Sequence, residues 1–594
     1  MSVKLRSVRA MPVAPISDPS LQPPVTDARS RLRHRQTRGS QVWRLATVTI
    51  ATLVCLPILA VLWLALIPAE NIWPHLLSTV LPGYVLTTLI LMVGVAIGTL
   101  VIGVSTAWLV THYEFPLRGW LTWALLLPFA VPAYVIAYVY TDLLEFAGPV
   151  QSLLRDWFGW RSARDYWFPA IRSTGGAVTM LVLVLYPYVY LLARAAFLEQ
   201  SASMLEVARV LGCGQRDRLL RIALPMARPA IVVGVAMALM ETLNDYGTVD
   251  YFAVRTLTAG IYDVWLGTNN LGGGAQIASL LLVFVMMLIG LEKVSRARQH
   301  NYQPGSSRLR PLTRRRPAVH WQWTLCLLCL LPVLLGFVVP AWVLLRYSIS
   351  HFDASLNSEF YTLVGNSVLL AALAAGSATS IGVILSYSKR MLNDRALSLW
   401  VSLSSLGYAV PGAVLAIGIM IPFSTFDNAL DSMMRSTFGV STGLLLSGTV
   451  FALVFAYTIR FLAVAFGSID ASMKKISPNM DDAARALGQT PFGILRKVHL
   501  PLMRSGLLTA ALVVFVDCMK ELPATLILRP FNFDTLATHV YQYASDELLA
   551  ESSLAALLIV VAGLIPVLLL SLGIERSRGS NPSAHGDSRF PNQE

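Results

Sequence analysis

Charged side chains are scarce in this chain of 594 residues. Asp, Glu, Lys and Arg together make up 13% of it, whereas 55% of its residues are hydrophobic. An average soluble domain has about 25% charged residues. The shortage of charge excludes a soluble enzyme and predicts a protein that is embedded in a membrane.

Cysteine and histidine are also rare, with five Cys and nine His. The histidines show no ligand spacing, and the cysteines lie in or beside apolar stretches, which argues against a disulfide framework. Cys326 and Cys329 form a CxxC pair, but the apolar run around them favours two buried thiols over redox or zinc chemistry. We therefore expect no stable metal site and no cofactor.

The chain also lacks a phosphate-binding P-loop. Such a loop needs a Gly-Lys pair, and none of the seven lysines follows a glycine. An ATPase site of its own is therefore not expected, and we interpret the protein as a non-enzymatic one.

Long apolar runs are what the sequence has in abundance. A membrane-spanning helix needs about 20 apolar residues, and twelve segments qualify, which divide into six and six. They are centred near Ile58, Ala96, Pro132, Leu185, Met237, Val285, Leu334, Ala372, Ala413, Val454, Val513 and Ile559. The predicted fold is an all-α integral membrane protein of about twelve transmembrane helices.

The polar segments divide the chain. Residues 1–42 are rich in Pro, Ser and Arg and are predicted to be a disordered tail. Two halves are expected at 43–293 and 321–575, joined by a basic linker at 294–320 and followed by a disordered tail at 576–594. The first apolar run starts too late and lacks a cleavage site for a secretory signal, so we interpret it as a retained anchor.

Basic residues fix an expected orientation. With a cytoplasmic N-terminus, 35 of the 46 Lys and Arg residues fall in cytoplasmic segments, as the positive-inside rule requires. Both termini and the linker are then cytoplasmic. The net charge of +13 is explained by this topology, so we expect membrane lipid and no nucleic acid among the partners.

Two cytoplasmic loops repeat each other. The segment 204–231 reads MLEVARVLGCGQRDRLLRIALPMARPAI, and 480–507 reads MDDAARALGQTPFGILRKVHLPLMRSGL. A shift of 276 residues superposes Glu206 on Asp482, Ala208 on Ala484, Arg209 on Arg485, Gly212 on Gly488, Pro225 on Pro501 and Arg228 on Arg504. Because each half has an even number of crossings, the halves should form a parallel repeat, related by an axis along the membrane normal.

The local sequence of the first loop predicts a short helix-turn-helix. Residues 204–211 favour a helix, Gly212 permits a tight turn, and 217–223 can form a second short helix before Pro225. Small residues would let the first helix lie deep in the groove of a partner. An amphipathic helix resting on lipid headgroups is the alternative.

Each loop contains an acidic residue, followed by Ala, then Gly, and later a Pro. This pattern resembles the EAA loop of binding-protein-dependent ABC importer permeases, and it occurs once in each half. The resemblance implies the type I importer permease fold, in a bacterial inner membrane. It also implies coupling to a separate dimer of ATP-binding cassette subunits, through Glu206, Ala208, Gly212, Asp482, Ala483, Ala484 and Gly488. A periplasmic or lipid-anchored binding protein would deliver the substrate.

The stretches from Glu241 and from Asp517 are similar to those of fused ferric-iron permeases, a resemblance that covers about residues 45–575. It implies an importer that moves ferric iron by alternating access. Permeases for thiamine, 2-aminoethylphosphonate, polyamines and oxyanions share much of the same framework and stay open as alternatives.

A candidate translocation path comes from the acids in these stretches. Under the same shift, each half places two acids at positions i and i+4, on one helical face. Ferric iron prefers oxygen ligands. Burying ionisable groups in a membrane costs free energy, so these residues favour a path that is lined by protein or filled with water. The candidates are Glu241, Asp245, Tyr246, Asp517, Lys520 and Glu521.

Three other interpretations of these residues remain open. The first is that the side chains satisfy the backbone of helices broken around Gly247 and Pro523. The second is that they pair with one another across the two halves, and the third is that they contact the binding protein. Lys520 could pair with Asp517, three residues before it.

Two other classes of protein are alternatives to the permease. A twelve-helix secondary transporter of the major facilitator superfamily has the same helix count, but the paired loops argue against it. A polytopic membrane enzyme would need a cluster of His, Asp or Glu near one interface, and the sequence shows none.

Overall fold

The chain folds into a bundle of membrane-length helices. The computed structural model describes residues 25–67, 72–200, 210, 212, 214–297, 314–392 and 394–579. Within these ranges the only β-pairing is an isolated bridge between Tyr113 and Arg315. Ten helices are long and apolar enough to cross a membrane, or up to twelve if two bent helix pairs each count as one span. The predicted all-α membrane fold is confirmed.

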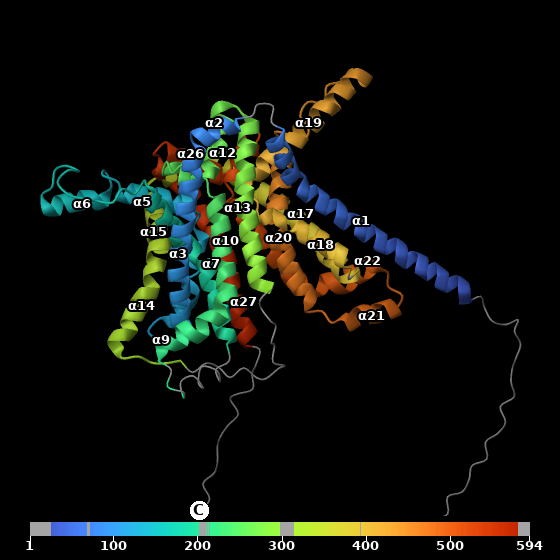
Figure 1. Cartoon of the computed structure of the whole chain (residues 1–594), viewed down its shortest axis with the longest axis horizontal. Coiled ribbons are helices and arrows are strands. Elements are labelled where there is room, and N and C mark those ends of the chain that lie inside the picture. The colour runs from blue at the N-terminus through green and yellow to red at the C-terminus, as the bar shows by residue number, and fades with distance from the viewer. Residues whose placement is uncertain are drawn as a thin grey trace, which may run out of the picture.

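The first half contributes spans one to six in chain order (Figure 1). Its elements are α1 (Val25–Leu66), α2 (Trp73–Ser78), α3 (Leu81–His112), α4 (Arg118–Ala124), η2 (Leu127–Ala130), α5 (Ala133–Leu144), α6 (Pro149–Phe158), α7 (Thr174–Glu199), α9 (Gln215–Asp217), η3 (Arg218–Ala223), α10 (Leu224–Asn244), α11 (Gly247–Tyr251), α12 (Leu257–Tyr262), η4 (Asp263–Gly267) and α13 (Leu271–Ala297).

The second half repeats this order. Its elements are α14 (Val319–Val333), η5 (Leu334–Val338), α15 (Val339–Ser350), α16 (Phe352–Ser355), α17 (Ser358–Leu392), α18 (Arg395–Ser404), η6 (Leu406–Ala409), α19 (Gly412–Phe438), α20 (Val450–Lys474), α21 (Pro478–Ala486), α22 (Pro491–Ile494), η7 (Leu495–His499), α23 (Leu500–Leu502), α24 (Arg504–Met519), α25 (Pro523–Leu528), α26 (Leu536–Ser545) and α27 (Leu549–Gly579).

The third span of the first half is broken at an Ala-Val-Pro sequence, which recurs between η6 and α19 in the second half. Val131 (φ −91°, ψ 123°) and Val410 (φ −78°, ψ 122°) are extended, which is the conformation that a residue before proline favours. In the first half the helices on either side of the break meet at 91°. The first break lines the cavity that holds the candidate path residues, and at the second the Val410 carbonyl accepts a hydrogen bond from Arg460.

The first span of each half packs largely against the other half. Helix α1 contacts α17, α18 and α19 of the second half as well as α13, and α14 contacts α3 and α4 of the first half. Helix α15 packs against both α5 and α27. The predicted halves, 43–293 and 321–575, are therefore segments of sequence rather than separately packed bodies.

The polar ends differ in part from the prediction. Helix α1 begins at Val25, so the prediction of a disordered tail is wrong for 25–42. After Pro24 this stretch contains Ala, Arg, Leu and Gln, which favour a helix, and no further proline. Helix α27 likewise extends to Gly579, beyond the expected boundary at 575. Residues 1–24, most of the linker (298–313) and 580–594 lie outside the described part of the chain.

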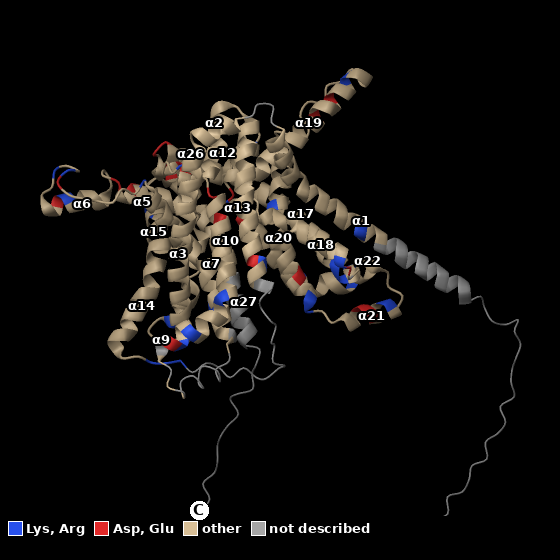
Figure 2. Ribbon diagram, viewed as in Figure 1, with Lys and Arg blue, Asp and Glu red and all other residues tan. Residues whose placement is uncertain are grey.

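The two ends of the bundle carry different elements. Figure 1 places α9, α21 and α22 at one end, which we call the loop end, and α2, α12 and α26 at the opposite end, which we call the distal end. Helix α6 and the last part of α19 project outward near the distal end. Basic residues gather at the loop end, around α9 and α22 (Figure 2).

Candidate functional site

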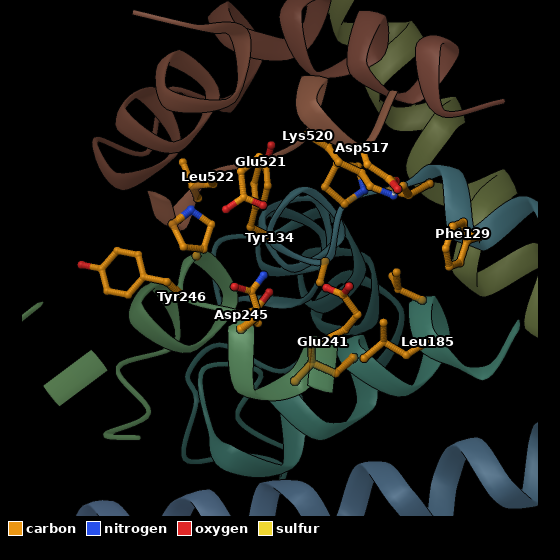
Figure 3. Close-up of a pocket in the computed structure, with 18 of the residues that line it drawn as sticks. Phe129, Tyr134, Leu185, Glu241, Asp245, Tyr246, Asp517, Lys520, Glu521 and Leu522 are labelled. Carbon is orange, nitrogen blue, oxygen red and sulfur yellow. Dashed lines mark ion pairs between the residues drawn. The ribbon is translucent and has the colours of Figure 1, made fainter. Parts of the chain in front are cut away.

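A polar cavity lies where the broken helices of the two halves meet. Its volume is about 110 Å³, room for a few water molecules at about 30 Å³ each. All six candidate path residues line it, and Figure 3 shows Glu241 and Asp245 facing Asp517 and Glu521 across the space. The structure brings all six residues to one cavity, while their role in transport stays a prediction.

The first half contributes two carboxylates from the end of α10. Glu241 accepts a hydrogen bond from the Tyr408 hydroxyl at 2.9 Å. Asp245 lies just past the helix and accepts hydrogen bonds from the backbone amides of Thr248 (3.0 Å) and Val249 (3.3 Å). These amides belong to the first turn of α11, which would otherwise lack acceptors. Asp245 therefore holds the helix restart after the break.

The second half contributes two ion pairs at the end of α24. The Lys520 ammonium lies 3.0 Å from an Asp517 carboxylate oxygen, as the spacing suggested, and it also lies 4.7 Å from the centre of the Phe129 ring. The Arg460 guanidinium Nε lies 3.0 Å from Glu521, with the two side chains only 3% and 5% exposed. Both acids of this half thus have a basic partner.

Contacts between the halves close the cavity around these groups. The Asn244 side chain accepts a hydrogen bond from the Gly412 amide at 2.8 Å, and the Tyr262 hydroxyl donates to the Pro523 carbonyl at 2.6 Å. A Cβ at Gly247 would lie 2.7 Å from Tyr134, closer than real side chains approach. The start of α11 in the first half therefore packs closely against neighbouring side chains.

The alternative roles of the acids can now be separated. Asp245 caps α11, and Glu521 accepts a 3.3 Å hydrogen bond from the Ala524 amide in α25, so both serve the broken helices as that reading proposed. Glu241 instead reaches across the halves to Tyr408. Asp517 pairs with Lys520. The six residues therefore form one cavity but fill different structural roles.

Sequence reasoning missed two side chains of this site. Arg460 pairs with Glu521, and Tyr408 binds Glu241 and lies 3.3 Å from the Tyr188 hydroxyl. Arg460 could have been found as a basic residue inside an apolar span, which rarely occurs without a partner or function. Tyr408 carried no comparable signal, because aromatic residues are common in such helices.

Charge is unevenly distributed around the cavity. Four carboxylates and two basic side chains line it. Both basic groups form their ion pairs with acids of the second half, and among the described residues neither carboxylate of the first half forms an ion pair, although Arg460 also interacts electrostatically with Glu241. The site therefore has an excess of acidic oxygen atoms, which favours cations over anions.

The repeated loops contain the turn that the sequence predicted. Gly212 (φ 81°) and Gly488 (φ 76°) are both left-handed, a conformation that glycine adopts without the cost paid by other residues. In the second loop, α21 exposes Asp482 and Ala483 and buries Ala484. Helix η3 runs into α10 without stopping at Pro225, which lies directly after the π-helical residues of η3. Glu206 and Ala208 lie outside the described residues.

A charge network that we had not predicted anchors the second loop. Asp481 lies 2.8 Å from Nε of Arg390 on α17 and 2.8 Å from Nε2 of the fully buried His499. Arg390 also donates hydrogen bonds to the carbonyls of Met473 and Ile476. The helix that carries Asp482 is thereby tied to the end of a membrane span.

Among the described residues, no group of three or more His, Cys, Asp or Glu side chains is placed to hold a metal ion. Cys326 and Cys329 are both buried and unpaired in α14, as the apolar run around them predicted.

Comparison with known proteins supplies the family. The model of the binding-protein-dependent transport system inner membrane component matches residues 99–299 and again 378–578. The chain belongs to this family. The two matched ranges contain the two repeated loops and both sides of the cavity, so the protein is a membrane permease component that carries two copies of the family domain.

Individual relatives of this permease are named for different substrates. The Fe(3+)-transport system permease protein FbpB 2 of Haemophilus influenzae is 26% identical over 81% of this chain and 88% of its own length. The molybdenum transport system permease protein ModB of Escherichia coli K12 is 27% identical over 33% of this chain and 86% of its own. The putative 2-aminoethylphosphonate permease PhnV of Salmonella typhimurium is 25% identical over 39% of this chain and 79% of its own.

Among solved structures, a bacterial ABC transporter involved in the import of the acidic polysaccharide alginate aligns with 44% of this chain and 96% of its own. The alignment has a TM-score of 0.32 and 15% identity.

Proposed function

We propose that this permease is the membrane component of an ATP-driven importer of ferric iron, and that the iron passes the central cavity by alternating access. The observation that carries the proposal is the acidic excess of that cavity, four carboxylates against two basic groups. Ferric iron is a hard cation that prefers oxygen ligands. The relative that spans most of both chains is named for Fe(3+) transport, which agrees with this charge balance.

The same charge balance argues against an oxyanion as cargo. Molybdate or a phosphonate would have to pass Glu241 and Asp245, neither of which forms an ion pair with a described residue. Like charges at close range are costly where the dielectric constant is low. Thiamine or a polyamine would suit the charge, but the cavity of about 110 Å³ would have to widen to admit them.

Coupling to ATP hydrolysis is assigned to the two repeated loops. Helix α21 lies at the loop end with Asp482, Ala483 and Leu487 exposed, the last of them 80% accessible. A short helix with exposed small and apolar residues fits the groove of a partner protein. We assign that groove to a separate dimer of ATP-binding cassette subunits, since this chain has no Gly-Lys pair for a P-loop of its own.

The loop end is assigned to the cytoplasm of a bacterial cell. The segments expected on that side hold 35 of the 46 basic residues, and the positive-inside rule places such segments in the cytoplasm. The distal end, with α2, α12 and α26, would then receive iron from a periplasmic or lipid-anchored binding protein. In this orientation both termini are cytoplasmic.

Uptake of radiolabelled ferric iron tests the proposal. An iron-starved strain would be compared with and without this chain, and with its partner ATPase disabled. We expect uptake to be lost in both altered strains, and excess molybdate should not compete. Unchanged iron uptake without the chain would overturn the iron assignment and direct attention to thiamine, polyamines and phosphonates.

The same experiment separates a secondary transporter from an ATP-driven one. If uptake depends on the chain but survives loss of the ATPase, the coupling proposal fails. The paired loops, with left-handed glycines at matching positions, favour the ATP-driven mechanism.

A further inference from the structure

A large apolar groove faces outward near the loop end of the first half. It lies between α3, the continuous η3–α10 segment and α14, and its volume is about 700 Å³. Its walls include the exposed side chains of Leu100 and Val101 on α3, Leu220 on η3 and Leu328 on α14. All of these elements lie within membrane-length spans, so the groove opens toward the bilayer.

A second apolar cavity extends this groove toward the middle of the membrane. Its volume is about 280 Å³, and it shares Leu100, Ile231 and Val232 with the groove. It continues between α3, α10 and α13, and its far end is lined by Leu239 and Leu288. The two hollows together form one apolar channel along the outside of the first half, suited to extended hydrocarbon chains.

One basic residue lines this otherwise apolar surface. Arg228 lies one turn into α10 and is exposed in the groove, and it forms no hydrogen bond or ion pair with any residue that the structure describes. A guanidinium within a membrane span needs a partner or access to the headgroups. Lipid phosphate is such a partner, because its oxygens match the planar donor pattern of arginine.

The charge around Arg228 favours an anionic headgroup over a zwitterionic one. The preceding segment, α9 and η3, contains Arg216, Arg218 and Arg221 but only one acid, Asp217. Asp217 is already engaged, since it pairs with Arg221 at 3.2 Å. Clusters of basic residues at the edge of a span attract anionic lipids.

We propose that this groove is a binding site for one anionic phospholipid, whose phosphate contacts Arg228 and whose acyl chains lie along Leu100, Ile231 and Val232. The site includes the end of the first repeated segment, 204–231, because η3 and Arg228 both lie within it. The lipid would therefore brace the first loop from the membrane side. This proposal does not depend on which substrate the permease carries.

Lipid retention by the purified full chain tests the site. The protein would be placed in nanodiscs of equal parts palmitoyl-oleoyl phosphatidylglycerol and phosphatidylcholine, released into mild detergent, and examined by native mass spectrometry. We expect the wild type to retain phosphatidylglycerol over phosphatidylcholine by at least about fivefold. Equal retention of the two lipids would overturn the proposal.

Three variants locate the lipid. Arg228→Gln should abolish the preference for phosphatidylglycerol, whereas Arg504→Gln should preserve it, because Arg504 is the repeat counterpart of Arg228 and does not line the groove. Val232→Trp should reduce retention of both lipids by filling the groove. An equal effect of Arg228→Gln and Arg504→Gln would show general attraction to the bilayer surface instead and refute the site.

A different occupant would also be visible in this experiment. A copurified polypeptide that crosslinks to a photoreactive residue at Leu328 in place of lipid would contradict the proposal. Because Arg228→Gln changes an exposed side chain, it should leave the thermal unfolding temperature in detergent unchanged, and its result stands even if Val232→Trp fails to fold.

Discussion

The two halves of this permease place the same pair of acids around the cavity but neutralise them differently. In the second half, Asp517 pairs with Lys520 and Glu521 pairs with Arg460. Under the shift of 276 residues the first half has Asn244 in place of Lys520 and Val184 in place of Arg460. Duplication of the domain thus provides a common frame, while two substitutions leave the carboxylates of only one half without a basic partner.

The loops differ in a similar way. In the second half, Asp481 and His499 form a buried network with Arg390. A shift of 276 residues puts Leu205 and Ala223 at the matching positions of the first half, where the Ala223 carbonyl accepts a hydrogen bond from Gln200 instead. The second loop is therefore held by charge, and at these positions the first has only apolar side chains.

Breaking the ion pair of the second half should have the largest effect on stability. Arg460→Met leaves the Glu521 carboxylate buried without its partner, which costs about 3 to 5 kcal/mol. We expect a large fall in the thermal unfolding temperature in detergent. The double variant Arg460→Met with Glu521→Gln should recover most of that loss, because no unpaired charge remains. If Arg460→Met is as stable as the wild type, the pair does not hold the second half.

The repeated glycines test whether both loops couple to the ATPase. Val at Gly212 and Gly488 would be forced into a left-handed conformation, at about 1 to 2 kcal/mol each. We expect the double variant Gly212→Val with Gly488→Val to insert into the membrane but to lose iron uptake.

The single variants and a control sharpen that result. Each glycine variant alone should reduce uptake if both loops transmit closure. Gly467→Val, at a helical position in α20 with open space around it, should leave uptake near the wild-type level. Normal uptake by the double variant would refute the coupling role.

The network of the second loop predicts a smaller, local effect. Asp481→Asn removes the charge that faces Arg390 and His499, and weakening such a buried interaction costs about 1 to 3 kcal/mol. Amide hydrogen exchange should become faster in α21, 478–486. Asp482→Asn is the matched control, because its side chain is exposed and its pair with Arg485 contributes little. Equal exchange in the two variants would contradict the anchoring role.

The fold could be predicted largely from the sequence because the patterns that indicate it occur in both halves. Apolar length gave the spans, the shift of 276 residues gave the two loops, and the repeated Ala-Val-Pro sequences mark the breaks at Val131 and Val410. The packing of α1 against the second half could not be predicted. Its apolar surface is compatible with many neighbours, and helix contacts in a membrane depend on shape more than on pattern.

The sequence predicted which residues line the site but not most of the pairs that they form. Sequence spacing identified the acids at i and i+4 and the Asp517–Lys520 pair, because these residues lie close together in the chain. The contacts of Glu241 with Tyr408 and of Glu521 with Arg460 join residues from different helices. Only the tertiary arrangement of the broken spans shows which acids are left without a basic partner.

We propose that the carboxylates of the first half make the cavity selective for cations. Its most direct test is ferric-iron uptake by Glu241→Gln beside its repeat counterpart Asp517→Asn, each at matched membrane levels. We predict that Glu241→Gln lowers uptake at least about tenfold, equivalent to about 1.4 kcal/mol in the barrier, and that Asp517→Asn lowers it less. Wild-type uptake by Glu241→Gln, or a greater loss in Asp517→Asn, would contradict the claim.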